Sequence, residues 1–253
     1  MTSPETPFLS RIEYELSSAD AITFSDAPRL YAWLLEQLSS DEAEWIHEGG
    51  GQALTQHVRK EPKTGKMIWS VSLLSGEANR AILPALKKDL TIELHPETLN
   101  ASMLRQDSFG TPLEFIQNTK RHPVERLTEL SILSPLAFHQ AGRYVIYPEE
   151  HLLLQSLLKK WNAAAPAYTL EDEDAIRSLE NGLLIRDYRL HTVRFALKGN
   201  KIPGCLGKLY LQSRMPEPLF EIWSLLLWFG CFAGAGVKTT LGMGALDIRS
   251  LRE

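Results

Sequence analysis

The sequence predicts an α+β fold in which helices cover one face of antiparallel sheets, and three observations support this prediction. Short segments alternate apolar with charged residues, as half-buried strands do. Other segments carry apolar residues every three or four positions, as helices do. Both kinds of segment recur in a similar order in the two halves of the chain. A chain of 253 residues also has room for two compact domains, each with a core of its own.

The first half begins with a predicted strand at residues 10–16, whose apolar residues alternate with arginine and glutamate. Pro28, a favoured early residue of a helix, opens a segment with leucines at helical spacing. A second helix ends at the three glycines of residues 49–51. The remaining elements are strands at residues 52–60 and 66–73, a helix at 77–88 and a strand at 90–94. This order is that of the ferredoxin-like fold, in which two helices cover one face of a four-stranded antiparallel sheet.

A weaker version of the same order recurs in the second half. It consists of strands at residues 127–133 and 143–147, a helix at 149–161, strands at 188–197 and 208–212, a helix at 218–232 and a strand at 245–251. We therefore predict two tandem ferredoxin-like domains (RRM-like, or split βαβ) at residues 1–120 and 121–253.

The formal net charge of −4 counts against a protein covered uniformly by nucleic acid, because phosphate binding requires local positive potential. A nucleic-acid site must therefore be a patch, and residues 186–214 contain a candidate. An acidic segment at residues 171–174 offsets its charge. The alternative is a solvated surface of mixed charge, the commoner origin of such runs. The patch combines one acid, Asp187, with Arg186, Arg189, Arg194, Lys198, Lys201, Lys208 and Arg214.

Cys205 and Cys231 each stand alone, so the sequence predicts neither a disulfide framework nor a zinc site. No other cluster has metal-ligand spacing, and we expect no metal and no cofactor. The chain opens without a signal-peptide pattern, and the apolar residues 222–237 are too few to cross a bilayer. We interpret them as a buried helix that runs into a glycine-rich loop. These features predict a cytoplasmic protein with no membrane partner.

The most unusual segment is glycine-rich and has the sequence GAGVKTTLGMG at residues 234–244. A dinucleotide-binding fingerprint needs an acid about 20 residues later, but only nine residues follow Gly244. A P-loop needs a lysine where Met243 stands. Two interpretations remain: the backbone approaches a phosphate chain, or the glycines make a tight connection between helix and strand. In the first interpretation the contacts come from Gly234, Gly236, Lys238, Thr239, Thr240, Gly242 and Gly244.

Residues 232–244 resemble the C-terminal loop of the CRISPR-associated protein 6 family, Phe-Ala-Gly-x-Gly-x-Lys-Thr-Thr-x-Gly-Met-Gly. The resemblance is specific from about residue 130 onward, and before that it rests on the order of elements. Ala235 departs from the family pattern by replacing a bulkier residue, and Leu136 departs from it by standing where threonine is common. The other matching segments are residues 133–138, 142–148, 157–162 and 204–210.

The resemblance implies a metal-independent endoribonuclease that binds CRISPR repeat RNA and cuts the precursor transcript into guide RNA units. In such a reaction the ribose 2′-hydroxyl attacks its own phosphate and leaves 2′,3′-cyclic phosphate and 5′-hydroxyl ends. The resemblance also implies that RNA is contacted by the glycine-rich loop and by the basic strands, at Arg189, Arg194, Lys198 and Lys208.

Of the seven histidines, His47 resembles the usual catalytic histidine of the family, because it ends a helix just before a run of glycines. Histidine suits proton transfer because its pKa of about 6.5 lies near working pH. Tyr31 resembles a second catalytic position, although its spacing also fits the core face of a helix. Arg59 or Lys60 would supply a cation for the transition state. His57 is the substitute if His47 points away from the RNA.

Two alternatives remain beside this hypothesis. The same scaffold suits a non-catalytic RNA-binding subunit of a CRISPR effector complex, which would bind the repeat without cutting it. A nucleotide-binding regulatory protein is disfavoured because both nucleotide motifs fail. The sequence leaves open whether the protein forms a homodimer and whether it hands its product to an effector complex.

Overall fold

The computed structural model of this protein describes residues 6–18, 22–48 and 53–250, and they divide into two compact units. The first unit comprises Met1–Thr111 and Thr239–Gly242, and the second comprises Pro112–Lys238 and Met243–Glu253. The expected domain boundary between residues 120 and 121 lies at the end of helix α4 (Pro112–Arg121). The tip of the glycine-rich loop thus belongs to the first unit.

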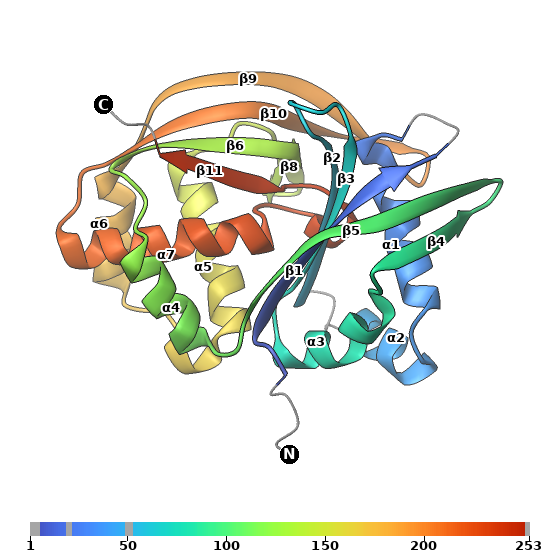
Figure 1. The fold of residues 1–253 in the computed structure, drawn as a ribbon. Coiled ribbons are helices and arrows are strands. Elements are labelled where there is room, and N and C mark those ends of the chain that lie inside the picture. Colours follow the sequence, from blue (N-terminus) through green and yellow to red (C-terminus); the bar gives the residue numbers. More distant parts are fainter. Residues whose placement is uncertain (1–5, 19–21, 49–52, 251–253) are drawn as a thin grey trace, which may run out of the picture. The chain divides into compact units, whose positions relative to one another are not determined.

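An antiparallel five-stranded sheet with the order β2-β3-β1-β5-β4 frames the first unit (Figure 1). Its strands are β1 (Leu9–Ser17), β2 (Leu54–Lys60), β3 (Met67–Leu73), β4 (Asp89–Leu94) and β5 (Glu97–Phe109). Its helices are η1 (Phe24–Asp26), α1 (Ala27–Glu36), α2 (Ser40–His47), α3 (Gly76–Ile82) and η3 (Leu83–Ala85).

Strand β5, which the sequence did not indicate, takes the place beside β1 that was expected for residues 90–94. Those residues form β4 instead, an additional strand at the edge of the sheet. Residues 104–108 of β5 are exposed, so this half of the strand shows no apolar alternation. The prediction of a four-stranded sheet was therefore wrong by one edge strand, while the ferredoxin-like order of the other four strands is confirmed.

The core of the first unit lies between the sheet and its helices. Ile12, Tyr14 and Leu16 alternate along β1 and are buried in this core, as their spacing predicts. Leu30 and Leu34 of α1 lie one turn apart in the same core. The intervening residues of β1 point to the opposite face of the sheet, which is charged.

The second unit contains an antiparallel four-stranded sheet with the order β11-β6-β10-β9, which is the ferredoxin-like order. Figure 1 shows helices α5 and α7 on one face of this sheet. The strands are β6 (Leu127–Leu136), β9 (Leu183–Leu197), β10 (Asn200–Ser213) and β11 (Leu246–Ser250). The helices are α4, α5 (Glu150–Ala164), η4 (Pro166–Tyr168), α6 (Glu173–Gly182) and α7 (Glu217–Ala233).

Three features of the second unit differ from expectation. The strand expected at residues 143–147 is β8 (Arg143–Val145), which pairs with β7 (Phe138–Gln140) in a separate two-stranded sheet. Strands β9 and β10 are longer than predicted and form a ribbon (Figure 1). The acidic segment begins α6, where the Asp172 carboxylate accepts a hydrogen bond from Ala175 N at 2.8 Å. Asp172 therefore caps the helix, and the acids of its first turn interact favourably with the positive end of the helix dipole.

The apolar residues near the C-terminus form α7, which ends at Ala233 before the glycine-rich loop. Most of its residues are buried, so the expected buried helix is confirmed. No helix within the described ranges is long and apolar enough to cross a membrane.

Candidate active site and RNA-binding loop

Tyr31 lies on α1 with its side chain half-buried against the core of the first unit. Burial raises the pKa of the Tyr31 phenol above its ordinary value of 10. A phenol with a raised pKa keeps its proton at neutral pH. Tyr31 can therefore donate a hydrogen bond to an anionic oxygen, but it cannot act as a base there.

His47 is the last residue of α2, in agreement with the predicted helix end. Ser39 fixes the start of this helix through a capping box with Glu42. Glu42 N donates to Ser39 Oγ at 3.4 Å, and Ser39 N donates to the Glu42 carboxylate at 2.9 Å. The side chain of His47 and the glycines at residues 49–51 lie outside the described residues.

His57, the expected substitute, lies on β2 and is partly buried. Its Nε2 atom is buried and has no hydrogen-bond partner among the described residues. Burial, followed by the charges of Arg11 and Arg59, lowers the pKa of His57 to about 3. Such a ring is neutral at pH 7 and binds protons too weakly for general acid–base catalysis near that pH.

The two candidate cations end strand β2, and their surroundings differ. The Arg59 guanidinium lies 3.3 Å from the Glu13 carboxylate and 3.3 Å from that of Glu61. Glu13 is buried and also meets Arg105 at 2.9 Å. Lys60, by contrast, is exposed. Of the two, Lys60 is the better placed to meet an incoming phosphate, because Arg59 already neutralises acids of the protein.

Arg189 and Lys208 form a cross-strand pair on the β9–β10 ribbon. Leu209, the neighbour of Lys208, is buried in the core, so the pair points to the opposite face of the sheet. Lys208 Nζ lies 2.7 Å from the carboxylate of Glu129 on β6. This acid lowers the positive potential around the pair.

The other basic candidates on the ribbon do not extend this pair into one patch. Arg194 is five positions after Arg189 on the same strand, so its side chain points to the other face of the sheet. Lys198 is exposed in the turn between the strands, with a φ angle of 48°. The candidates are thus spread over two faces and a turn, and local alternation along β9 causes this separation.

The glycine-rich loop is held at its base by hydrogen bonds within the second unit. Gly236 N donates to Ser156 Oγ of α5 at 2.8 Å, and Gly244 N donates to Pro135 O at 3.0 Å. A Cβ atom on Gly236 would lie 2.2 Å from Ala137 O, so no other residue fits there. These glycine amides are engaged inside the protein, and they shape the loop.

The tip of the loop, Thr239–Gly242, belongs to the first unit and packs against α1. Gly242 has a φ angle of 106°, and a Cβ atom on it would lie 2.3 Å from Ala27 Cβ. Ala27 begins α1, and Tyr31 follows it by one helical turn on the same side. The structure therefore brings the loop tip to the helix that carries the candidate tyrosine.

Gln56 of β2 secures this arrangement, and the sequence analysis did not identify it as a site residue. Its Nε2 atom donates to Ala27 O at 2.9 Å and to Thr240 O at 3.0 Å. A signal was available in the sequence, because Gln56 alternates with Leu54 and Val58 on the apolar side of its strand. A polar residue in such a position requires buried hydrogen-bond partners.

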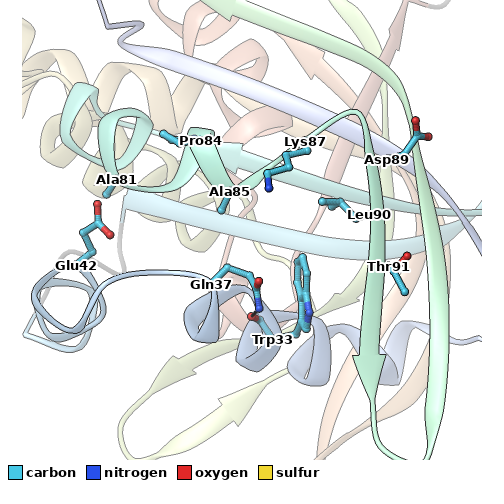
Figure 2. Close-up of a pocket in the computed structure, with 10 residues that line it drawn as sticks. All are labelled: Trp33, Gln37, Glu42, Ala81, Pro84, Ala85, Lys87, Asp89, Leu90 and Thr91. Carbon is cyan, nitrogen blue, oxygen red and sulfur yellow. Dashed lines mark hydrogen bonds between the residues drawn. The ribbon is translucent and has the colours of Figure 1, made fainter.

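A separate pocket of about 460 Å³ lies in the first unit (Figure 2). Trp33 and Gln37 of α1 and Glu42 of α2 line it, together with residues of α3, η3 and β4. None of the candidate site residues lines this pocket.

Known proteins resemble this chain in sequence and in fold. Residues 130–246 match the family model described as CRISPR-associated endoribonuclease Cas6. A Cas6 of Streptococcus thermophilus is 27% identical over 231 residues, which cover 90% of this chain and 93% of that protein. A Cas6 of Mycobacterium tuberculosis is 26% identical over 227 residues, covering 88% of this chain and 72% of that protein. A solved Cas6 product complex superposes with a TM-score of 0.75 at 22% identity, over 96% of this chain and 99% of that one.

The two tandem ferredoxin-like domains and the glycine-rich loop before the last strand define the fold, which this chain shares with the solved Cas6 structures. The match to the CRISPR-associated endoribonuclease Cas6 family model covers residues 130–246, and Cas6 relatives of 26% and 27% identity align with most of the chain. Its matched region includes the glycine-rich loop and the basic ribbon.

Proposed function

We propose that this protein is an endoribonuclease that binds CRISPR repeat RNA and cuts precursor transcripts into guide RNA units. Relatives named as CRISPR-associated endoribonucleases align with 88% and 90% of the chain. The observation that carries the proposal is the packing of the loop tip against α1, through Gly242 and Ala27. RNA held at the loop tip would lie beside the helix that bears Tyr31.

We propose a reaction in which the RNA supplies the nucleophile. The 2′-hydroxyl next to the cut attacks its own phosphorus, the bond to the 5′ oxygen breaks, and a 2′,3′-cyclic phosphate and a 5′-hydroxyl form. His47 moves protons in this step, because the ordinary pKa of a histidine, about 6.5, lies near working pH. Tyr31 donates its phenolic proton in a hydrogen bond to the charged phosphoryl oxygen. Lys60 supplies the cation in preference to Arg59, which is paired with Glu13 and Glu61.

We propose that RNA contacts come from two regions. On the loop, exposed Lys238 and the hydroxyls of Thr239 and Thr240 contact the RNA backbone, while Gly234, Gly236, Gly242 and Gly244 set the course of the chain. On the ribbon, Arg189 and Lys208 contribute on one face. Contacts of this kind position an RNA without reading its sequence.

The deciding experiment is cleavage of a labelled repeat RNA in EDTA by wild type and by His47→Ala. A matched RNA carries a 2′-deoxy substitution at the cut site. We expect a single cut by wild type, none in the deoxy RNA, and a loss of roughly a hundredfold or more in rate for His47→Ala. EDTA-sensitive cutting would contradict the metal-independent step.

Two other outcomes would redirect the assignment. Tight binding of repeat RNA without cutting would favour a holding subunit of a CRISPR effector complex. Normal cutting by His47→Ala would keep the enzyme and remove His47 from its site. The buried environment of His57 then makes Tyr31 and Lys60 the next residues to replace.

A further inference from the structure

The carboxamide of Gln56 makes three hydrogen bonds in the interior of the first unit. Trp69 Nε1 donates to Gln56 Oε1 at 2.9 Å. Because an indole N–H can only donate, the carbonyl oxygen of the amide must face Trp69. The NH2 group then faces two backbone carbonyls, those of Ala27 at 2.9 Å and Thr240 at 3.0 Å.

These bonds join segments that are remote in the sequence. Gln56 is only 2% exposed, so water cannot replace a lost partner easily. Ala27 O belongs to the first turn of α1, and Thr240 O belongs to η5 (Thr239–Leu241) at the tip of the glycine-rich loop. One side chain therefore sets the position of the loop tip relative to the helix that carries Tyr31.

The packing of Gly242 supports the same role. A Cβ atom built on Gly242 lies 2.3 Å from Ala27 and 3.8 Å from Gln56 Nε2. The loop tip therefore fits against both Ala27 and the amide of Gln56. An apolar side chain at position 56 would fill the space but would remove the hydrogen bonds that Gln56 donates to both carbonyl oxygens.

We propose that Gln56 is a positioning residue: its carboxamide fixes the tip of the glycine-rich loop against α1 and so determines where bound RNA meets the catalytic residues. The effect of Gln56 on cleavage rests on the proposed function. The anchoring of the loop tip is a property of the protein without RNA, and it can be tested separately.

The test compares three variants with wild type. Gln56→Met keeps the length of the side chain and removes both donors. Gln56→Glu keeps an acceptor for Trp69 and offers a donor only when its carboxyl group is protonated. Tyr14→Phe is the matched control, because the Tyr14 hydroxyl donates a partly buried hydrogen bond to Lys87 O at 2.9 Å. This variant loses one side-chain hydrogen bond to a backbone carbonyl in the same unit.

Hydrogen exchange of the peptide that contains residues 239–242, measured without RNA, reports on the anchor directly. We expect Gln56→Met to accelerate this exchange by roughly tenfold or more, and Tyr14→Phe to leave it at the wild-type rate. Equal exchange in the two variants would overturn the inference. This arm gives an answer even if wild type fails to cut RNA, a result that would sink the proposed function alone.

Single-turnover cleavage at saturating protein reports on the consequence. We expect Gln56→Met to slow the cutting of bound RNA by roughly tenfold or more, with Tyr14→Phe near wild type. Burial raises the pKa of a carboxyl group at position 56. The Gln56→Glu protein should therefore approach wild type at pH 5, where it can donate, and fall behind at pH 8. A ratio to wild type that does not change with pH would contradict the role of the donor.

Discussion

The Arg59 guanidinium lies 3.3 Å from the carboxylate of Glu13, on the charged face of the first sheet. The Glu13 side chain is only 8% exposed and that of Arg59 is 17% exposed. Each charge has therefore lost most of its contact with water, and the other charge compensates for that loss. This pair makes Arg59 a structural cation, whereas the neighbouring Lys60 is exposed to solvent.

Replacing these two residues separately should separate their roles. Arg59→Met removes one partner of buried Glu13 and should lower the free energy of unfolding by about 2 kcal/mol, because Arg105 remains beside the acid. Lys60→Met should change stability by less than about 0.5 kcal/mol and slow cleavage. Urea unfolding and single-turnover cleavage of both variants make the comparison. Loss of cleavage in a fully folded Arg59→Met protein would contradict it.

The buried ring of His57 should make the protein sensitive to acid. Its pKa falls from the ordinary 6.5 to about 3 in the folded protein. Between these values the unfolded state binds the proton and the folded state does not, so stability falls as the pH is lowered from about 6.5 to about 3. His57→Gln should flatten this slope by up to about 1.4 kcal/mol per pH unit. It should also leave the rate of cleavage at pH 7 within about twofold of wild type, because His57 takes no proton there.

Lys160 should contribute a second pH dependence, on the alkaline side. Burial lowers the pKa of Lys160 from 10.5 to about 7, and its Nζ atom donates to Ala233 O at 2.7 Å, beside the glycine-rich loop. Between pH 7 and 10.5 the unfolded state binds the extra proton, so the free energy of unfolding rises with pH. Lys160→Met should remove this rise. Lys159→Met, at the exposed neighbouring position, is the control and should retain it.

Gly242, the glycine at the tip of the loop, should tolerate no larger residue without a loss of stability and activity. Gly242→Ala places a Cβ atom 2.3 Å from Ala27 at a φ angle of 106°. We expect a loss of roughly 2–4 kcal/mol in stability and at least tenfold slower cleavage. Gly199→Ala is the control, because its φ angle is 78° but nothing lies within 4 Å of the added atom. It should cost only the backbone strain, about 1 kcal/mol, and cleavage by a folded Gly199→Ala protein should stay normal.

Much of the fold follows from patterns that are local in the sequence. The alternation of Ile12, Tyr14 and Leu16 identifies a strand because successive side chains point to opposite faces of a sheet. The spacing of Leu30 and Leu34 identifies the buried side of α1 for an analogous reason. Strand β5 escaped prediction because its exposed half carries no apolar period. Local periodicity can reveal only elements that bury one face.

The sequence by itself determined the ferredoxin-like order of elements, the resemblance to the Cas6 family and the candidate residues, since these depend on spacing along the chain. Only the tertiary structure decided which candidates meet. It paired Arg59 with Glu13, buried the Nε2 atom of His57, and placed Thr240 beside Gln56, 184 positions away. Contacts between such distant residues depend on how whole elements pack. The spacing of residues within one element does not contain that information.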